Sequence, residues 1–260
     1  MGSLAGKSPA NTYKSLLKVA DETNGVTGTL STVEDGEGTS SSLSVSQGQI
    51  MIYPNSDTIR TLRVRNASGT DLLVVDTNNS LVKVGTSQVS ATTQLLTFSA
   101  YRLVTGSAGN HNMIAVGGNG FGANIAEISC GSGTDPNTTV DKTTVTDELV
   151  NMLFNVPFNM VIDAVKVFVS TDQDTDTTLN YHLMSYDMVA DGTTNDGDLS
   201  NGTVLADGQA TSVDRNVLKS TDLTIQSSSV TSGKVIACFV ENETNTDDIN
   251  IQVQVKYHIA

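Results

Sequence analysis

Residues 248–259 read DINIQVQVKYHI, the clearest alternation in the chain. Apolar side chains occupy every second position from Ile249 to Ile259, and Asn, Gln, Lys and His lie between them. Successive side chains of a strand point to opposite faces of its sheet, and one buried and one solvated face is typical of an antiparallel sheet. The stretch therefore predicts a long, half-buried antiparallel strand.

The rest of residues 101–260 predicts more strands of the same kind. Strand-like stretches occur at 160–170, 179–188, 221–226 and 234–240, and long loops rich in Asp, Gly, Asn and Thr separate them. Strands at this spacing predict an antiparallel β-sandwich, most similar to a jelly roll. Residues 147–154 (DELVNMLF) fit either a strand or one or two helical turns.

The composition agrees with an all-β protein. The 260 residues include 22 Gly and 4 Pro, with 38% apolar and 16% charged residues. Ser, Thr, Asn and Asp are abundant, and they compete with the helical backbone for hydrogen bonds. No apolar run approaches the length of a membrane span and no signal peptide is recognisable, so we expect no membrane insertion.

The first third of the chain has shorter strands. Five pieces are separated by turn residues: 43–46, 49–53, 61–65, 71–76 and 81–85. A thin layer of such strands is unstable alone, so we expect a homotrimer in which three copies bury their aliphatic faces. Leu73 and Val75 share one face of a strand and are the predicted trimer-packing residues.

Three parts of the chain follow from these patterns. Residues 1–25 form an N-terminal segment, residues 26–100 a short-stranded module, and residues 101–260 a sandwich domain. The stretch 86–100 is small and polar, which indicates a connection.

The N-terminal segment is the one basic stretch of an acidic protein. Residues 8–25 fit either a helix or a short strand. We expect this segment to contact another molecule through the following side chains: Lys7, Tyr13, Lys14, Leu16, Leu17 and Lys18.

Charge is unevenly distributed along the chain. The net charge is −14; residues 1–100 carry 7 basic and 8 acidic side chains, and residues 101–260 carry 7 and 20. A strongly acidic domain repels phosphate backbones, so we expect no nucleic-acid partner.

The stretch DGEGT at residues 35–39 resembles several kinds of functional loop. It lacks the Lys of a phosphate-binding loop, and a strand rather than a helix follows it. A structural turn fits better, made of Asp35, Gly36, Glu37, Gly38 and Thr39.

Metal sites and catalysis have little support in the sequence. Asp172, Asp174 and Asp176, with Asp247 or Asp248, are weak calcium candidates, because the loop has Thr177 and Leu183 where a calcium loop needs Gly and Glu. The histidines lack HxH or HExxH spacing: His111, His182 and His258. There is no GxSxG motif, and Cys130 and Cys238 lie in apolar stretches that predict burial. We therefore expect no resident metal, no cofactor and no enzymatic activity.

A resemblance suggests a function. The run SPANTYKSLLKVADETNGVTGTLSTVEDGEGTSSSLSVS (8–46), followed by TLRVRNASGTDLLVVDTNNSLVKVGT (61–86), resembles the N-terminal module of tailed-bacteriophage fibre and other virion structural proteins, especially those of phages of marine bacteria. It covers about residues 8–100.

The resemblance implies a position in the virion after synthesis in the host cytoplasm. The N-terminal module would attach to other virion proteins and trimerise, and the distal domain would face a host-cell receptor. The alternative is a capsid-attached head fibre or decoration protein. A glycan-cleaving spike is the weakest hypothesis, because residues 101–260 cannot build the long β-solenoid of such enzymes.

Overall fold

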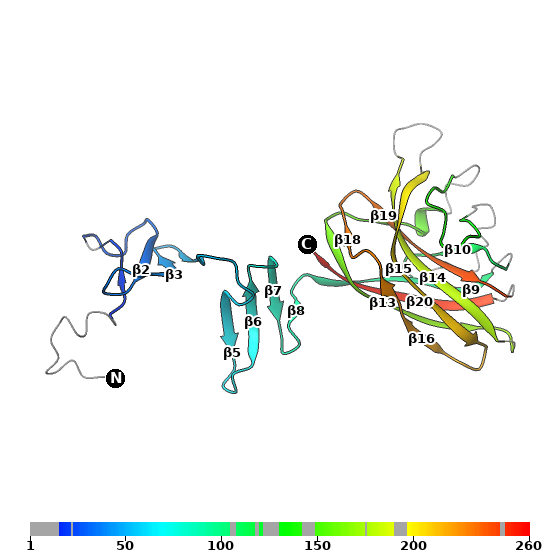
Figure 1. The fold of residues 1–260 in the computed structure, drawn as a ribbon, viewed down its shortest axis with the longest axis horizontal. Coiled ribbons are helices and arrows are strands. Elements are labelled where there is room, and N and C mark those ends of the chain that lie inside the picture. The colour runs from blue at the N-terminus through cyan, green and yellow to red at the C-terminus, as the bar shows by residue number, and fades with distance from the viewer. Residues whose placement is uncertain are drawn as a thin grey trace. The chain divides into compact units, whose positions relative to one another are not determined.

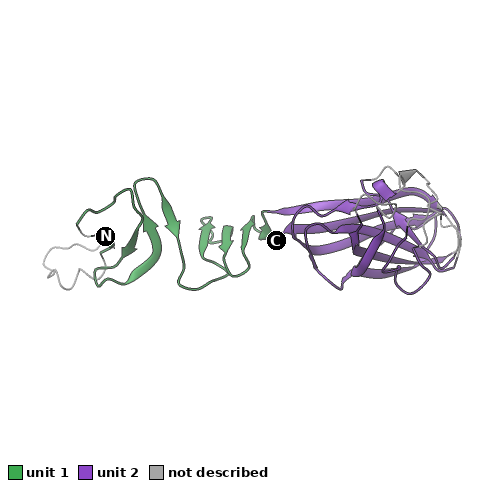
Figure 2. Cartoon of the chain, turned by 90° about the horizontal axis from the view of Figure 1, so that it is seen from above, with its two compact units in different colours: residues 1–91 green, residues 92–260 purple. Residues whose placement is uncertain are grey.

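The protein is described by a computed structural model. It covers residues 16–21, 23–104, 108–117, 120–121, 130–141, 149–174, 176–189, 197–244 and 248–260. The chain divides into two compact units, residues 1–91 and 92–260, shown in different colours in Figure 2. No helix in the described part of the chain is long and apolar enough to span a bilayer.

Unit 1 contains two separate four-stranded antiparallel sheets. The first has the order β1-β2-β3-β4: β1 (Lys18–Val19), β2 (Ser31–Glu34), β3 (Ser40–Val45) and β4 (Ile50–Ile52). The second has the order β5-β6-β7-β8: β5 (Leu62–Arg65), β6 (Asp71–Asp76), β7 (Leu81–Val84) and β8 (Val89–Ser90). The five short strands predicted between residues 43 and 85 are confirmed as β3 to β7.

Unit 2 is built from two six-stranded sheets (Figure 1). One sheet has the order β10-β19-β14-β15-β17 with β12 beside β19: β10 (His111–Ile114), β12 (Phe154–Asn155), β14 (Thr177–Met188), β15 (Leu199–Val213), β17 (Thr224–Ile225) and β19 (Val235–Asn242). The other has the order β11-β9-β20-β13-β16 with β18 beside β13: β9 (Thr93–Val104), β11 (Gly120–Phe121), β13 (Met160–Thr171), β16 (Lys219–Asp222), β18 (Ser229–Val230) and β20 (Asp248–Ile259).

The strand order is that of a jelly roll. Taken in chain order, the eight principal strands are β9, β10, β13, β14, β15, β16, β19 and β20. Strands one, eight, three and six of this series form one sheet, and strands two, seven, four and five form the other. Two Greek keys wound together give this order, so the all-β, jelly-roll-like prediction is confirmed.

The predicted connection over residues 86–100 is wrong in its second half. Residues 93–104 form β9, which pairs with β20 along its length. Leu96, Phe98 and Ala100 alternate into the core, while Leu95 points to solvent. In the sequence, the adjacent Leu95 and Leu96 among Thr, Gln and Ser obscure this alternation. Because β9 belongs to unit 2, the boundary between the units lies at residue 91 rather than at residue 100.

Two apolar clusters stabilise unit 2. The larger fills the space between the sheets and contains the inward residues of β20, confirming the pattern read in residues 248–259. The smaller lies on the outer face of the β10-β19-β14-β15 sheet, where Met113, Met184 and Phe239 pack against Cys130 and Leu149. Because both faces of β19 are covered, all eight of its residues are buried.

The stretch 147–154, which fits either a strand or helical turns, contains both a helical turn and the start of a strand in its described residues, 149–154. A short 3-10 turn, η2 (Leu149–Asn151), precedes β12. The buried Leu149 and Met152 help to cover the outer face of the sheet. Cys130 and Cys238 are both buried, as predicted.

Candidate functional site

The candidate site lies at the polar end of the outer face of the β10-β19-β14-β15 sheet. Alternation along β10, β14 and β19 places His111, His182 and Glu241 on the same face as the smaller apolar cluster. Strand pairing sets Glu241 opposite His111, and Phe239 opposite His182. Residues far apart in the sequence therefore meet on one surface.

The three side chains are close and buried. His111, His182 and Glu241 have exposed fractions of 3%, 4% and 7%. The two imidazole rings lie 4.9 Å apart between centroids, and Nε2 of His111 lies 3.8 Å from Oε2 of Glu241. One nitrogen or oxygen from each residue falls within 4.8 Å of those of the other two.

The proton position on His111 follows from its neighbour. Nδ1 lies 3.0 Å from the backbone oxygen of Gly131. A carbonyl oxygen only accepts hydrogen bonds, so Nδ1 carries the proton. The other ring nitrogen, Nε2, then faces the carboxylate of Glu241, 3.8 Å from Oε2.

His182 is held neutral by its surroundings. Burial and the neighbouring His111 lower its pKa to about 4, although Asp135 and Asp207 act in the opposite direction. Oδ1 of Asp135 lies 3.5 Å from Nδ1 of His182, long for a hydrogen bond. Neither nitrogen of His182 has a hydrogen-bond partner among the residues that the structure describes.

The carboxylate of Glu241 is oriented by a short polar chain. Nδ2 of Asn180 donates to Oε2 of Glu241 at 2.8 Å and to Oε1 of Glu243 at 2.7 Å. Nε2 of Gln209 in turn donates to Oδ1 of Asn180 at 2.9 Å. This chain of amides holds Glu241 facing the histidines.

A polar cavity of about 330 Å³ adjoins the cluster. His182 lines it together with the carboxylates of Asp135, Asp207 and Glu243. Divalent transition metals bind imidazole nitrogens and carboxylate oxygens as ligands. The acidic cavity would attract cations.

Sequence spacing could not reveal this cluster. The absence of an HxH or HExxH motif argues against a metal site whose ligands lie on a single strand or helix. It says nothing about ligands that come from different strands. Here strand pairing joins His111, His182 and Glu241. The available signal was a histidine inside each of two apolar strands, HNMIAV and LNYHLMSY. His258 lies elsewhere, with Nδ1 2.9 Å from Oδ1 of Asp163.

The acidic run predicted as a weak calcium site does not gather into a cluster. Asp174 forms an ion pair with Arg215 and accepts from Nδ2 of Asn216. Asp172 accepts from the side chain of Gln173. Among the described residues, the Asp172, Asp174 and Asp176 carboxylates do not converge with a further ligand. Asp247 lies outside the described residues.

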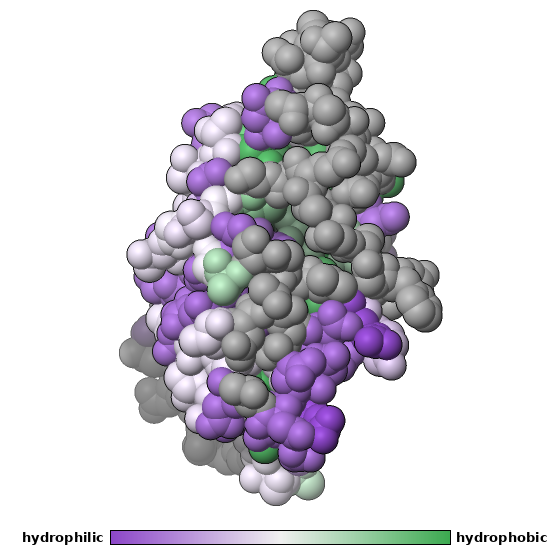
Figure 3. Space-filling view, turned by 90° about the vertical axis from the view of Figure 1, so that its right-hand side faces the viewer, coloured by the Kyte–Doolittle hydropathy of each residue, from purple (hydrophilic) through white to green (hydrophobic). Residues whose placement is uncertain are grey.

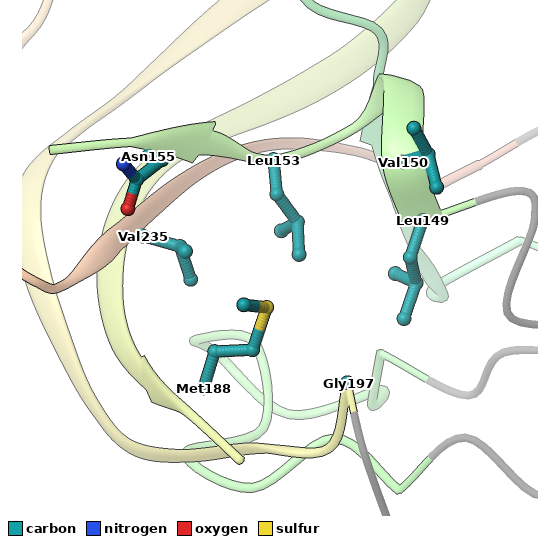
Figure 4. A pocket seen from close by; sticks show the side chains of 7 residues that line it. All are labelled: Leu149, Val150, Leu153, Asn155, Met188, Gly197 and Val235. Atoms are coloured by element: carbon teal, nitrogen blue, oxygen red, sulfur yellow. The ribbon is translucent and has the colours of Figure 1, made fainter. Parts of the chain in front are cut away.

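A separate apolar pocket lies near η2 (Figure 4). Its volume is about 280 Å³, and Leu149, Leu153, Met188 and Val235 point into it. Among the described residues that line it, Asn155 is the polar side chain and none is an acid or a base. The pocket has the size and apolar lining to accept an apolar group.

Part of the predicted contact segment lies outside the described residues: Lys7, Tyr13 and Lys14. Leu16 and Leu17 are exposed. Lys18 lies in β1 rather than in a helix, and its ammonium is 3.2 Å from Oε1 of Glu34 on β2. Strand pairing between β1 and β2 therefore supplies Lys18 with an acidic partner.

The DGEGT stretch forms the tight turn between β2 and β3. The backbone N–H of Asp35 donates to the Thr39 oxygen at 3.1 Å, and the N–H groups of Glu37 and Thr39 donate to Oδ1 of Asp35 at 2.9 and 2.8 Å. The backbone hydrogen bond from Thr39 lowers the pKa of Asp35 most. Gly36 is buried, and Gly38 adopts left-handed backbone with φ of 84°.

The same turn occurs a second time, between β5 and β6. Residues 66–70 read NASGT, and the N–H of Asn66 donates to the Thr70 oxygen at 3.0 Å. The N–H of Thr70 donates to Oδ1 of Asn66 at 2.9 Å, and Gly69 has φ of 85°. The motif is therefore a hairpin loop, Asp or Asn followed by two residues and Gly-Thr.

Leu73 and Val75 belong to a wholly aliphatic sheet face. Strand register places Leu62, Val75 and Val82 in one row and Val64, Leu73 and Val84 in the next. Leu62, Val64, Val82 and Val84 have exposed fractions of 37%, 50%, 42% and 42%. We call these six residues the aliphatic face.

The opposite face of the same sheet is closed by charged side chains. Val74 lies between Arg63 and Lys83 and is buried. Nε of Arg63 donates to Asp71, and Nζ of Lys83 lies 2.7 Å from Oδ2 of Asp76. The stems of these long cations cover the apolar centre. No described residue of unit 1 covers the aliphatic face in this way.

Comparisons with known proteins do not identify a family. No protein-family model matches the chain. No curated protein sequence matches it either. Among solved structures, the CBM22-1 and GH10 modules of the N-terminal endo-1,4-β-D-xylanase 10B of Clostridium thermocellum, complexed with xylohexaose, match with 12% identity and a TM-score of 0.24. The match covers 66% of this chain but only 25% of that one, and at this level it carries no functional argument.

Proposed function

We propose that the chain is a non-enzymatic structural protein of a bacteriophage virion, a fibre or spike whose unit 1 assembles as a homotrimer and whose jelly roll faces the host surface. The observation that carries the proposal is the aliphatic face of the β5–β8 sheet. Four of its six aliphatic side chains are exposed and Leu73 and Val75 are half-buried in a single chain, so another apolar surface would gain by covering them.

Further copies of the same chain are the occupants that fit best. Each copy would bring an equal face of six side chains, and three such faces around an axis bury one another in a closed assembly. Fully burying one Val or Leu side chain contributes about 1.5–3 kcal/mol, so the gain for each copy is large compared with the stability of a small domain.

The first sheet of unit 1 supports the same conclusion. Its edge strand β4 and the next residue expose Ile50, Met51, Ile52 and Tyr53. An exposed apolar edge strand is a template for pairing with another chain. Both sheets of unit 1 therefore leave surface that an assembly would cover.

Unit 2 has the properties of an independent exposed domain. It has its own core and most of the negative charge of the chain. The described residues on the face in Figure 3 are mostly hydrophilic or intermediate in character.

Truncation of the chain in the phage that encodes it tests this function. Particles carrying only residues 1–91 should keep the stub but adsorb poorly to host cells, because the jelly roll is missing. Particles whose chain lacks residues 1–20 should lose the protein altogether, because the attachment segment is missing. Normal adsorption by particles carrying the stub would reject receptor binding and favour the capsid-decoration role.

A further inference from the structure

We propose that His111, His182 and Glu241 bind one divalent transition metal ion of the zinc class on the outer face of the jelly-roll sheet. The inference concerns unit 2 alone and does not depend on the proposed place of the chain in a virion. It rests on the donor set, its burial and the partners that orient it.

The donor set matches zinc chemistry. Zinc prefers imidazole nitrogen and carboxylate oxygen in tetrahedral geometry, with bonds of about 2.0–2.2 Å. The chosen atoms of the three residues lie within 4.8 Å of one another, so small rotations of the side chains would bring them into coordination distance. Three protein ligands leave a fourth position for water or a ligand group.

Burial without hydrogen-bond partners is the second observation. Nε2 of His111 and both nitrogens of His182 lack a partner within the described ranges of the chain. An unsatisfied buried polar atom costs about 1–3 kcal/mol, and here several occur at one place and face a carboxylate. A bound cation would satisfy Nε2 of His111 and Nε2 of His182 together and would lie between these nitrogens and the carboxylate of Glu241.

Neighbouring groups lie beside each proposed ligand, and two of them form hydrogen bonds with it. Nδ1 of His111 is fixed by the Gly131 oxygen, which leaves Nε2 as the ligand atom. Nδ1 of His182 faces Asp135, which leaves its Nε2 as the ligand that we assign. A histidine that ligates a metal usually donates its other ring N–H to a carbonyl or carboxylate. Asn180 orients Glu241 in the same way.

The cavity beside His182 gives the ion a route. Asp135, Asp207 and Glu243 line it and provide negative charge along the way. The metal would join β10, β19 and β14 across the sheet, so its binding should also stabilise the fold.

The experiment titrates the full chain, freed of any affinity tag, with Zn²⁺ by calorimetry and with Co²⁺ by visible absorption. We expect one ion per chain, the intense visible bands of four-coordinate cobalt, and a higher melting temperature with zinc. Glu241→Gln keeps the size and the oxygen that accepts from Asn180, so it should fold. It should weaken binding by at least the roughly 10–100-fold typical of losing an outer partner.

Two further variants keep the test decisive. His182→Gln should remove the cobalt bands, with folding checked by circular dichroism. His258→Gln changes the third histidine, which pairs with Asp163 away from the cluster, and should bind as the unaltered chain does. The proposal is overturned if the unaltered chain shows no saturable binding of either ion, if folded Glu241→Gln and His182→Gln bind normally, or if His258→Gln loses binding equally.

Discussion

Single residues decide the loops of unit 1. Asp35 and Asn66 occupy the same place in two hairpins, and the side-chain oxygen of each accepts from the N–H four residues later. Gly38 and Gly69 adopt the left-handed conformation that closes each loop. The turn at DGEGT could be predicted from its composition. Its repetition at NASGT is harder to predict from composition, because one side chain is a carboxylate and the other is an amide.

The glycine of the second loop gives a test at this scale. Replacing Gly69 by Ala should destabilise the β5–β6 hairpin by about 1–2 kcal/mol, because an L-residue is disfavoured in left-handed backbone. Hydrogen exchange of the amides in residues 62–76 should then be faster by roughly 5–30-fold.

Gly48 provides the matched control. It lies in the β3–β4 loop without left-handed backbone, and an added Cβ would meet nothing within 4 Å. Gly48→Ala should leave the hydrogen exchange of the amides in residues 62–76 unchanged. Equal exchange in the two variants would refute the role given to the left-handed glycine.

At the scale of elements, the alternation of apolar and polar residues predicts β20, where it is regular. It does not predict β9, where two leucines are adjacent. β20 was predicted almost residue by residue, because its apolar positions are separated by amides and charges. β9 was missed because Leu95 faces solvent beside the inward Leu96. The histidine and glutamate cluster could not be predicted, since it depends on which strands pair, and pairing is set by the whole sheet.

The importance of β9 can be measured with fragments of unit 2. Residues 92–260 keep all eight principal strands and should unfold in one cooperative transition. Residues 101–260 lack Leu96 and Phe98, and losing one buried Phe costs about 3–5 kcal/mol, so this fragment should melt far lower or fail to fold. Circular dichroism against temperature measures both.

Point variants distinguish the effect of losing one buried side chain from the effect of removing the whole strand β9. In the 92–260 fragment, Phe98→Ala should lower the melting temperature strongly, because its side chain is fully buried. Leu95→Ala removes a side chain that is 71% exposed and should change little. Identical melting of the fragments starting at 92 and at 101 would contradict the assignment of β9 to the jelly roll.

At the scale of the whole molecule, the two units differ in how they are stabilised. Unit 2 closes a core between two sheets and covers part of one outer face as well. Unit 1 has small sheets whose apolar side chains stay largely exposed in a single chain. This contrast leads to the central claim, that unit 1 is an assembly module and the jelly roll is the domain that it presents.

The oligomeric state of the full chain tests this claim most directly. Sedimentation or light scattering at micromolar concentration should give three times the chain mass of 27.3 kDa. Leu73→Asp with Val75→Asp should abolish assembly, because both side chains lie in the aliphatic face. Leu72→Asp, at an exposed position on the opposite face of β6, should leave the trimer intact. A stable, folded monomer of the unaltered chain, or a double variant that assembles normally, would contradict the account.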